Sequence, residues 1–243
     1  MSRFLFTFLC LLALPVAAQQ RMLIQVSSGT GFFINRNGDV ITNAHVVRAC
    51  QSVSVHGEHG DAPATILAND TVRDLAVLHV DGEVGALASL RWNIVDLRPG
   101  DAVAVMGYPG QAGFEGHTHF ARTHVTSLQS PTGESNWLQL EPVAEHGNSG
   151  GPVLDTAGNV IAVITGKAST YRVAPGGGIS GAPVAEADVA ITLAALKGFL
   201  DDNHVSYYEV ASSAGDYGDV VLEQTAAHFI VNVRCVQGER PAS

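Results

Sequence analysis

The sequence predicts an all-β fold, a barrel or a sandwich, built from many short strands. Glycine is frequent, at 26 of 243 residues, and long helical periodicity is scarce. Apolar runs of strand length recur between turn residues. Hydrophobic residues make up 46% of the chain and charged residues 15%, so a sizeable core is expected rather than disorder.

In the first half of the chain, the expected strands are 30–34, 40–43, 52–55, 64–68 and 75–80. The first two are separated by the string Asn-Arg-Asn-Gly-Asp, which is a hairpin signal. This regular spacing of short runs and turns is typical of barrels and sandwiches.

In the second half, the expected strands are 102–106, 123–128, 137–140, 152–154 and 160–165. Residues 171–187 are rich in glycine, proline and alanine and predict a loop, and 189–191 a short strand. Thr192 is placed to cap a helix with Leu193, Leu196 and Leu200 on one face. Residues 219–226 suggest a short helix, and 228–235 alternate as a final strand.

Residues 1–18 have the pattern of a signal peptide. Arg3 precedes an apolar run, 4–14, and small residues follow at 15–18. The run is too short to span a bilayer, although an uncleaved anchor or a buried strand remains the alternative. We therefore expect a periplasmic or secreted protein without a stable membrane anchor after cleavage, with a main domain at 19–203 and an extension at 204–243 that packs on it.

Cysteine usage agrees with export. Cys10 lies in the leader, so the mature chain keeps Cys50 and Cys235. An oxidising compartment favours a disulfide between them, which would hold the C-terminal tail to the first part of the fold. Closing so long a loop is worth about 4–5 kcal/mol in the chain-entropy model. Two free buried thiols are the alternative.

The charge balance excludes some partners. Acidic residues outnumber basic ones by 23 to 13, for a formal net charge of −10, and lysine occurs only at 167 and 197. Nucleic-acid binding needs clustered basic residues, so we expect no nucleic-acid partner. The sequence leaves the oligomeric state open.

Three short motifs carry the chemistry of acyl transfer. His45 ends the string Thr-Asn-Ala-His, Asp74 begins Asp-Leu-Ala-Val-Leu, and Ser149 lies in Gly-Asn-Ser-Gly-Gly-Pro. A serine hydroxyl is a weak nucleophile until a base takes its proton, and a carboxylate can hold that base in the right tautomer. In a tight turn, the amides of Gly147 and Ser149 would stabilise the negative oxygen of a tetrahedral intermediate.

In this order the motifs resemble those of the trypsin-like serine peptidase superfamily, and most closely its bacterial HtrA/Do-like branch. The resemblance spans about 29–203 and implies a double six-stranded antiparallel β-barrel (chymotrypsin-like) with a C-terminal helix and a short tail. It implies a serine endopeptidase with His45, Asp74 and Ser149 as the triad, Gly147 as an oxyanion donor, a polypeptide substrate and no cofactor.

The resemblance also implies substrate-binding residues. Val143 stands where the family places the base of the specificity pocket, next to Ala144, so an apolar side chain before the scissile bond is expected. The strand containing Val189, Ala190 and Ile191 stands where the family pairs with substrate backbone.

Two departures limit the resemblance. The residues after 203 are too few for the PDZ domain of HtrA proteins, so their regulation and oligomers are not carried over. Asn148 stands where digestive trypsins have an aspartate that pairs with a new N-terminus, so we expect no zymogen switch of that kind.

Several other interpretations compete with this one. Gly-Asn-Ser-Gly-Gly also fits the nucleophile elbow of α/β-hydrolases, but there the serine precedes the acid and the histidine. Asp70 competes with Asp74 and is better suited to a turn. His117, His119 and His124, with His56 and His59, lack a metal-binding motif, so no metal site is expected. A catalytically silent binding protein and an esterase are the rival functions.

Overall fold

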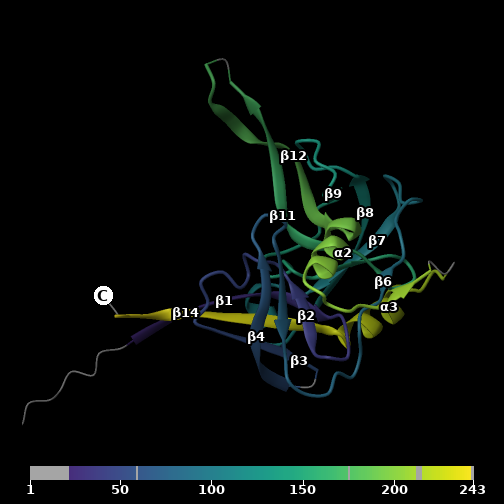
Figure 1. The fold of residues 1–243 in the computed structure, drawn as a ribbon. Coiled ribbons are helices and arrows are strands. Elements are labelled where there is room, and N and C mark those ends of the chain that lie inside the picture. The colour runs from purple at the N-terminus through teal and green to yellow at the C-terminus, as the bar shows by residue number, and fades with distance from the viewer. Residues whose placement is uncertain (1–21, 59, 175, 212–214, 242–243) are drawn as a thin grey trace, which may run out of the picture.

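Two closed, six-stranded antiparallel barrels form the body of the protein (Figure 1). The structure is a computed structural model, and it describes residues 22–58, 60–174, 176–211 and 215–241. The expected signal peptide lies outside the described residues. The all-β prediction and its double-barrel form are confirmed. Among the described residues, no helix is both long and apolar enough to cross a membrane.

The first barrel combines strands from both ends of the chain. In spatial order it contains β1 (Met22–Phe33), β14 (Ile230–Pro241), β3 (Ser52–Gly57), β4 (Gly60–Asp70), β5 (Leu75–His79) and β2 (Asp39–Thr42). The Asn-Gly hairpin predicted between the first two strands joins β1 to β2. Antiparallel pairing sets Thr42 at the end of β2 opposite Ala76 near the start of β5.

The second barrel comes from the middle of the chain. Its order is β10 (Pro152–Leu154), β7 (Ala102–Gly107), β8 (His119–Ser127), β9 (Trp137–Leu140), β12 (Ile179–Thr192) and β11 (Val160–Val173), closed by pairing of β11 with β10. Two short strands, β6 (Leu90–Arg91) and β13 (Glu209–Val210), extend the sheet beyond β11.

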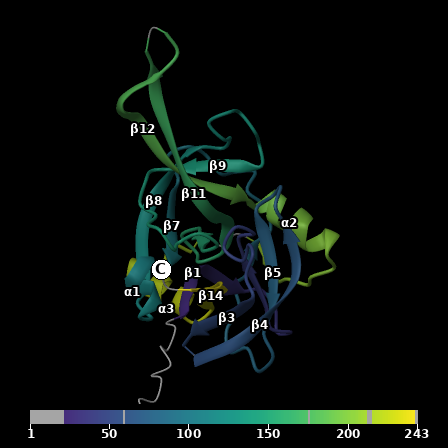
Figure 2. The same cartoon turned by 90° about the vertical axis from the view of Figure 1, so that its left-hand side faces the viewer.

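The prediction of a loop over 171–187 is wrong. Strands β11 and β12 continue as a long hairpin that projects from the body of the molecule (Figures 1 and 2). Its register is irregular, since Thr170 faces Ala185 while Arg172 faces Ser180. Glycine-rich composition suggested a loop, but backbone pairing between two neighbouring segments needs no particular side chains.

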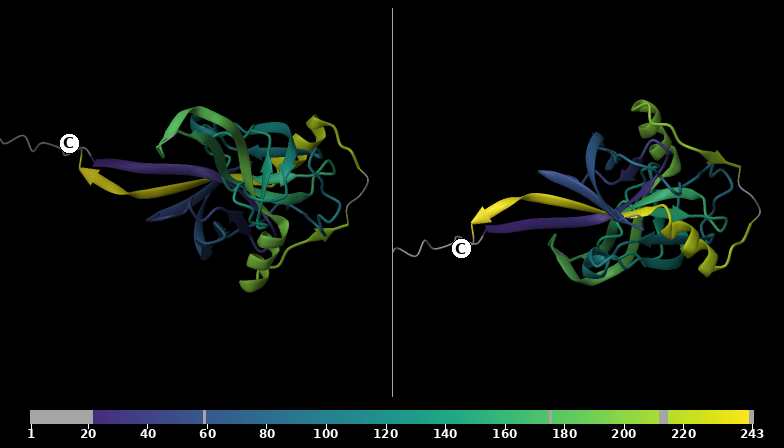
Figure 3. Two further views of the ribbon diagram at one scale, coloured as in Figure 1. Left: turned by 90° about the horizontal axis from the view of Figure 1, so that it is seen from above. Right: turned by 90° about the horizontal axis from the view of Figure 1, so that it is seen from below.

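The C-terminal segment, expected as an extension that packs on the main domain, supplies a strand of the first barrel. Strand β14 lies between β1 and β3, with Val233 opposite Gly29 on one side and Val55 on the other. Beyond the body of the protein, β1 and β14 run on together as a two-stranded ribbon (Figure 3). The domain boundary expected at residue 203 is therefore too early, because the barrel needs this last strand to close.

The expected disulfide is present. Cys235 of β14 is bonded to Cys50, which precedes β3, and their Cα atoms are 5.3 Å apart. The bond holds the C-terminal strand to the first barrel.

In the described part of the chain, three helices lie on or beside the barrels: α1 (Gly110–Phe114), α2 (Leu193–Asp202) and α3 (Asp219–Ala227). The expected cap of α2 is confirmed, since the Thr192 side chain accepts from the amide of Ala195. The helix predicted over 219–226 is α3.

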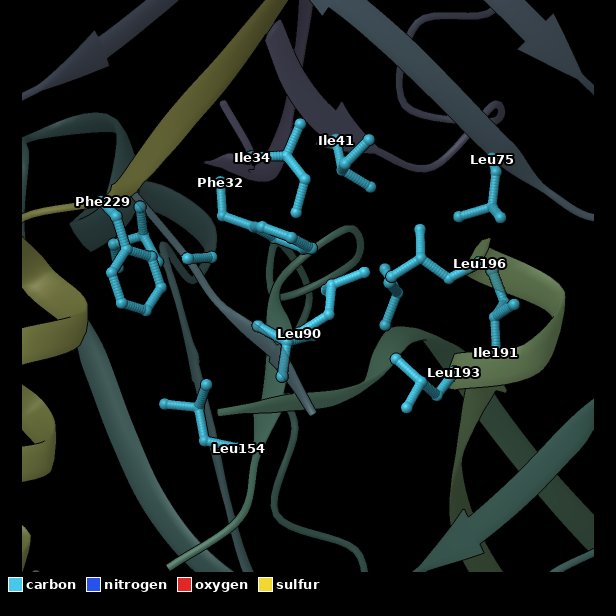
Figure 4. Close-up of a cluster of buried hydrophobic side chains, with 14 of the residues drawn as sticks. Phe32, Ile34, Ile41, Leu75, Leu90, Leu154, Ile191, Leu193, Leu196 and Phe229 are labelled. Atoms are coloured by element: carbon cyan, nitrogen blue, oxygen red, sulfur yellow. The ribbon is translucent and has the colours of Figure 1, made fainter. Parts of the chain in front are cut away.

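The largest apolar cluster joins the two barrels (Figure 4). Phe32 and Leu75 enter it from the first barrel, Leu154 from the second and Leu196 from α2, all of them buried. Full burial of such a side chain contributes about 1.5–3 kcal/mol. This packing fixes one barrel against the other, and with them the segments that carry the three motifs.

Candidate active site

The pairing of β2 with β5 brings His45 beside Asp74. His45 follows the end of β2, and Asp74 directly precedes β5. One carboxylate oxygen of Asp74, Oδ1, accepts the backbone N–H of His45 at 3.0 Å, and Oδ2 lies 2.8 Å from His45 Nδ1. A carboxylate only accepts, so the imidazole donates from Nδ1 and its Nε2 is left to accept a proton.

The backbone at Asp74 is held in an unusual conformation. Its φ is +56°, in the left-handed region that residues other than glycine seldom adopt. The buried side chain of Asn43 donates to the Asp74 carbonyl at 2.9 Å. Backbone strain of this kind persists where neighbouring contacts hold it in place, and it is concentrated at functional sites.

Two opposing effects set the charge of Asp74. Burial raises the pKa of its carboxyl, but hydrogen bonds from His45 and Thr165 and the charge of His45 together bring the pKa below its ordinary value. The group is therefore an anion at neutral pH. That charge suits it to orient the imidazole and to stabilise it when protonated.

Ser149 lies in a turn that only glycine neighbours allow. Gly147 and Gly150 have φ of +102° and +86°. A Cβ on Gly150 would collide with the Thr30 carbonyl and the Thr42 hydroxyl, three residues before His45. This close approach places the turn that contains Ser149 against the segment that carries His45.

Thr30 ties the turn to the first barrel. Its amide donates to the Ser149 carbonyl at 2.8 Å, and its hydroxyl donates to the Gly147 carbonyl at 2.7 Å. The same hydroxyl accepts the amide of Tyr108 at 2.8 Å. Thr30 is fully buried, so these bonds form away from solvent and fix the turn that presents Ser149.

The amides expected to bind an oxyanion are not used within the fold. In the described part of the chain, neither Gly147 N–H nor Ser149 N–H donates to a protein acceptor. The amides of Gly150 and Gly151 instead bond to the carbonyls of Ile164 and Asn148, at 2.8 Å each. The two unpaired donors therefore remain free for a ligand oxygen.

Thr165 links all three motifs, and the sequence analysis missed it. Its hydroxyl donates to Asp74 Oδ2, and its carbonyl accepts the Ser149 hydroxyl at 3.1 Å. Among the described residues, no hydrogen bond joins His45 to Ser149 directly. The only sequence signal was a hydroxyl residue at the end of the buried run 160–164.

The segment before Ser149 is held by the carboxylate of Asp188, to which the sequence analysis gave no role. The amides of Val143 and Ala144 both donate to Asp188 Oδ2, at 2.6 Å each. The apolar preference expected from Val143 and Ala144 did not take this buried carboxylate into account. A charged residue directly before the apolar run 189–191 was the available signal.

The expected pairing of Val189, Ala190 and Ile191 with substrate backbone is also wrong. These residues of β12 are paired with β9 on one side and with β11 on the other. Ala190 and Ile191 are buried. With both edges occupied, no free backbone donors or acceptors are left there for another strand.

The geometry bears on two alternatives from the sequence: Asp70 in place of Asp74, and a metal site formed by histidines. Asp70 accepts the amides of Val72 and Arg73 at 2.8 and 3.0 Å, which is the turn role expected of it. His119 lies 3.5 Å from the Asn148 side chain and 3.9 Å from Glu145. Within the described ranges, no three histidine, cysteine or acidic side chains are grouped to hold a metal ion, and His59 lies outside those ranges.

Comparison with known proteins agrees with this arrangement. A family model described as a trypsin-like peptidase domain matches residues 29–163, which include His45, Asp74 and Ser149. The crystal structure of the serine endoprotease from Yersinia pestis superposes with a TM-score of 0.54 at 23% identity, over 72% of this chain and 57% of that one. At this identity the likeness shows the fold alone.

Relatives among curated proteins are similar in sequence. The uncharacterised protein y4bJ of Sinorhizobium fredii is 35% identical over 212 residues, 86% of this chain and 32% of that protein. Serine protease HTRA4 of Homo sapiens is 30% identical over 145 residues, 58% of this chain and 30% of that protein. The chain thus spans about a third of the length of these relatives.

Proposed function

The chain belongs to the trypsin-like peptidase family, and on that premise we propose that it is a serine endopeptidase acting through an acyl-enzyme on Ser149. The observation that carries the proposal is the Asp74 carboxylate, which holds His45 through Nδ1 and leaves Nε2 facing away as a base. Thr165 connects this pair to Ser149. Unpaired amides at Gly147 and Ser149 support the oxyanion role.

In the first half of the reaction, His45 Nε2 takes the Ser149 proton while Oγ bonds to the substrate carbonyl carbon. The carbonyl oxygen becomes an anion next to the amides of Gly147 and Ser149. The C–N bond then breaks, and His45 gives its proton to the leaving amine. Water repeats the sequence on the acyl-enzyme and releases the acid, with Ser149 reprotonated.

One movement is required before chemistry. The Ser149 hydroxyl donates to the Thr165 carbonyl, so it must be redirected before it can donate to His45. Exchanging one neutral hydrogen bond for another costs little beside the barrier of amide hydrolysis. Substrate that displaces this contact would favour the redirected hydroxyl.

The test is labelling with a fluorophosphonate probe, followed by cleavage of a peptide library read by mass spectrometry. We expect labelling at Ser149, loss of labelling in S149A, and a rate about 10⁴-fold lower in D74N. Absence of labelling in a folded protein would point instead to a silent binding protein. Labelling with hydrolysis of simple esters but not of any peptide would point to an esterase.

We also propose that the protein acts outside the cytoplasm, in the periplasm or after secretion. The Cys50–Cys235 disulfide supports this, because such bonds persist in oxidising compartments. Fractionation of cells and sequencing of the mature N-terminus test it, with cleavage after Ala18 expected. The polypeptide substrate is part of the same proposal.

A further inference from the structure

Asp188 is a fully buried carboxylate whose two oxygens have different surroundings. Oδ2 accepts the amides of Val143 and Ala144. Oδ1 is buried too, and among the described residues it has no hydrogen-bond donor. The nearest cation is Lys167 Nζ, 3.9 Å from Oδ1, on a side chain that is 51% exposed.

The position of Asp188 relates it to the nucleophile along two chain segments. Val143 and Ala144 belong to the segment that leads into the turn of Gly147 and Ser149. Lys167 lies directly opposite Asp188 in the pairing of β11 with β12. It follows Thr165 by two residues, and the Thr165 carbonyl accepts the Ser149 hydroxyl. Asp188 therefore contacts both of the chain segments that lie next to Ser149.

A surface pocket of about 480 Å³ opens beside the same segments. Ala144, Glu145, His146 and Lys167 line one side of it, and residues 109–112 line the other. Ala144 and Lys167 both line this pocket and contact Asp188. Asp188 itself does not line this pocket, so a side chain bound here could reach Oδ1 only after Lys167 moves aside.

A buried carboxylate oxygen without a donor is costly, and such groups occur in folded proteins where a ligand or a function needs them. The ligand that fits is a cation with N–H donors on a flexible stem. Lysine and arginine side chains have this chemistry, and they pair well with a desolvated carboxylate.

We propose that Asp188 is a specificity-determining residue that selects lysine or arginine directly before the scissile bond. In the free protein, Lys167 occupies the place of the substrate cation, and it swings outward when a substrate side chain binds. This inference rests on the proposed peptidase function. It replaces the apolar preference expected from Val143 and Ala144, since those residues contribute their amides to holding the carboxylate.

The experiment uses one peptide sequence with arginine, lysine, alanine, valine or leucine before the scissile bond. In the wild type, we expect kcat/KM for the basic peptides to exceed the apolar ones by at least about tenfold. In D188N the asparagine oxygen can still accept both amides, so the segment keeps its anchor while the charge is lost. We expect kcat/KM for the basic peptides to fall about 100-fold and for the apolar peptides by less than about threefold.

Two further variants sharpen the test. K167A removes the competing ammonium and should raise kcat/KM for the basic peptides about three- to tenfold. E186Q removes an equal charge from an exposed position two residues away on β12 and should leave the preference unchanged. Equal losses for all peptides in D188N, or an apolar preference in the wild type, would overturn the proposal.

Failure of this inference can be told apart from failure of the peptidase function. If Ser149 is labelled by fluorophosphonate and apolar peptides are cut while basic ones are not, only the role of Asp188 is refuted. If no peptide is cut by a folded, disulfide-bonded protein, the peptidase proposal itself fails.

Discussion

The side-chain hydroxyl of Thr165 donates a hydrogen bond to the carboxylate of Asp74, 91 residues earlier in the chain. Thr165 lies in the second barrel, whereas Asp74 lies at the edge of the first barrel. Because the carbonyl of Thr165 also accepts the Ser149 hydroxyl, one residue couples Asp74 to Ser149 across the two barrels.

This contact predicts a positioning role for Thr165. In T165V the shape is kept but the donor is lost, so Asp74 Oδ2 keeps only the bond from His45 Nδ1. A hydrogen bond to a charged group is worth about 1.5–3 kcal/mol, so we expect kcat to fall about 10- to 100-fold with little change in KM. The conservative variant T165S should restore most of the rate. A loss in T165V confined to KM would contradict the role.

The lowered pKa of Asp74 predicts how stability changes in acid. Burial raises this pKa, but the hydrogen bonds from His45 and Thr165 and the charge of His45 lower it by more, so the net shift is downward. The contribution of the Asp74 carboxylate to stability is present above its unfolded pKa of about 3.9. It is lost as pH falls through the lower pKa of the folded state. Urea unfolding should compare the S149A variant with the S149A/D74N double variant. The difference in their free energies of unfolding should be large at pH 6 and shrink toward pH 2.

His79 predicts the opposite direction. Its pKa is raised, first by the hydrogen bond with Asp39 and despite partial burial. The pair therefore stabilises the fold below about pH 6.5, and this stabilisation is lost as pH rises through the raised folded pKa. We expect H79Q to lower the unfolding free energy at pH 5.5 more than at pH 9. The solvent-exposed pair of His124 and Glu141 supplies a control, and H124Q should have only a small effect.

Gly150 predicts a substitution that damages both stability and activity. In G150A the new Cβ would meet the Thr30 carbonyl and the Thr42 hydroxyl at a φ of +86°. Strain of this kind costs about 1–3 kcal/mol and should displace Ser149, so labelling by fluorophosphonate should slow together with a fall in Tm. The matched control is G198A in helix α2, where a Cβ meets nothing within 4 Å. It should stabilise by about 0.5–1 kcal/mol and leave labelling unchanged.

The disulfide predicts a dependence of stability on redox conditions. Cys235 lies on β14, a strand needed to close the first barrel, and Cys50 precedes the neighbouring strand. We expect reduction, or the C50S/C235S double variant, to cost about 2–5 kcal/mol. Thermal unfolding followed by circular dichroism, with and without reductant, measures this. An unchanged Tm would mean that strand pairing alone secures β14.

The amino-acid sequence alone indicated the candidate residues of the site. His45, Asp74 and Ser149 could be identified because each lies in a short string whose neighbours are dictated locally. Glycines at 147 and 150 permit a turn that other residues would strain, and an apolar run of strand length lies beside each motif. Hairpin signals and the cap at Thr192 were local in the same way.

Tertiary structure alone decided which distant groups meet these residues. Thr165 and Asp188 have no motif of their own, and their roles depend on strand register between segments far apart in sequence. The inclusion of β14 in the first barrel and the long β11–β12 hairpin likewise depend on backbone pairing, which many side chains tolerate. Local strings specify local geometry, whereas the partner of a buried carboxylate or of a free strand edge is fixed only when the whole chain packs.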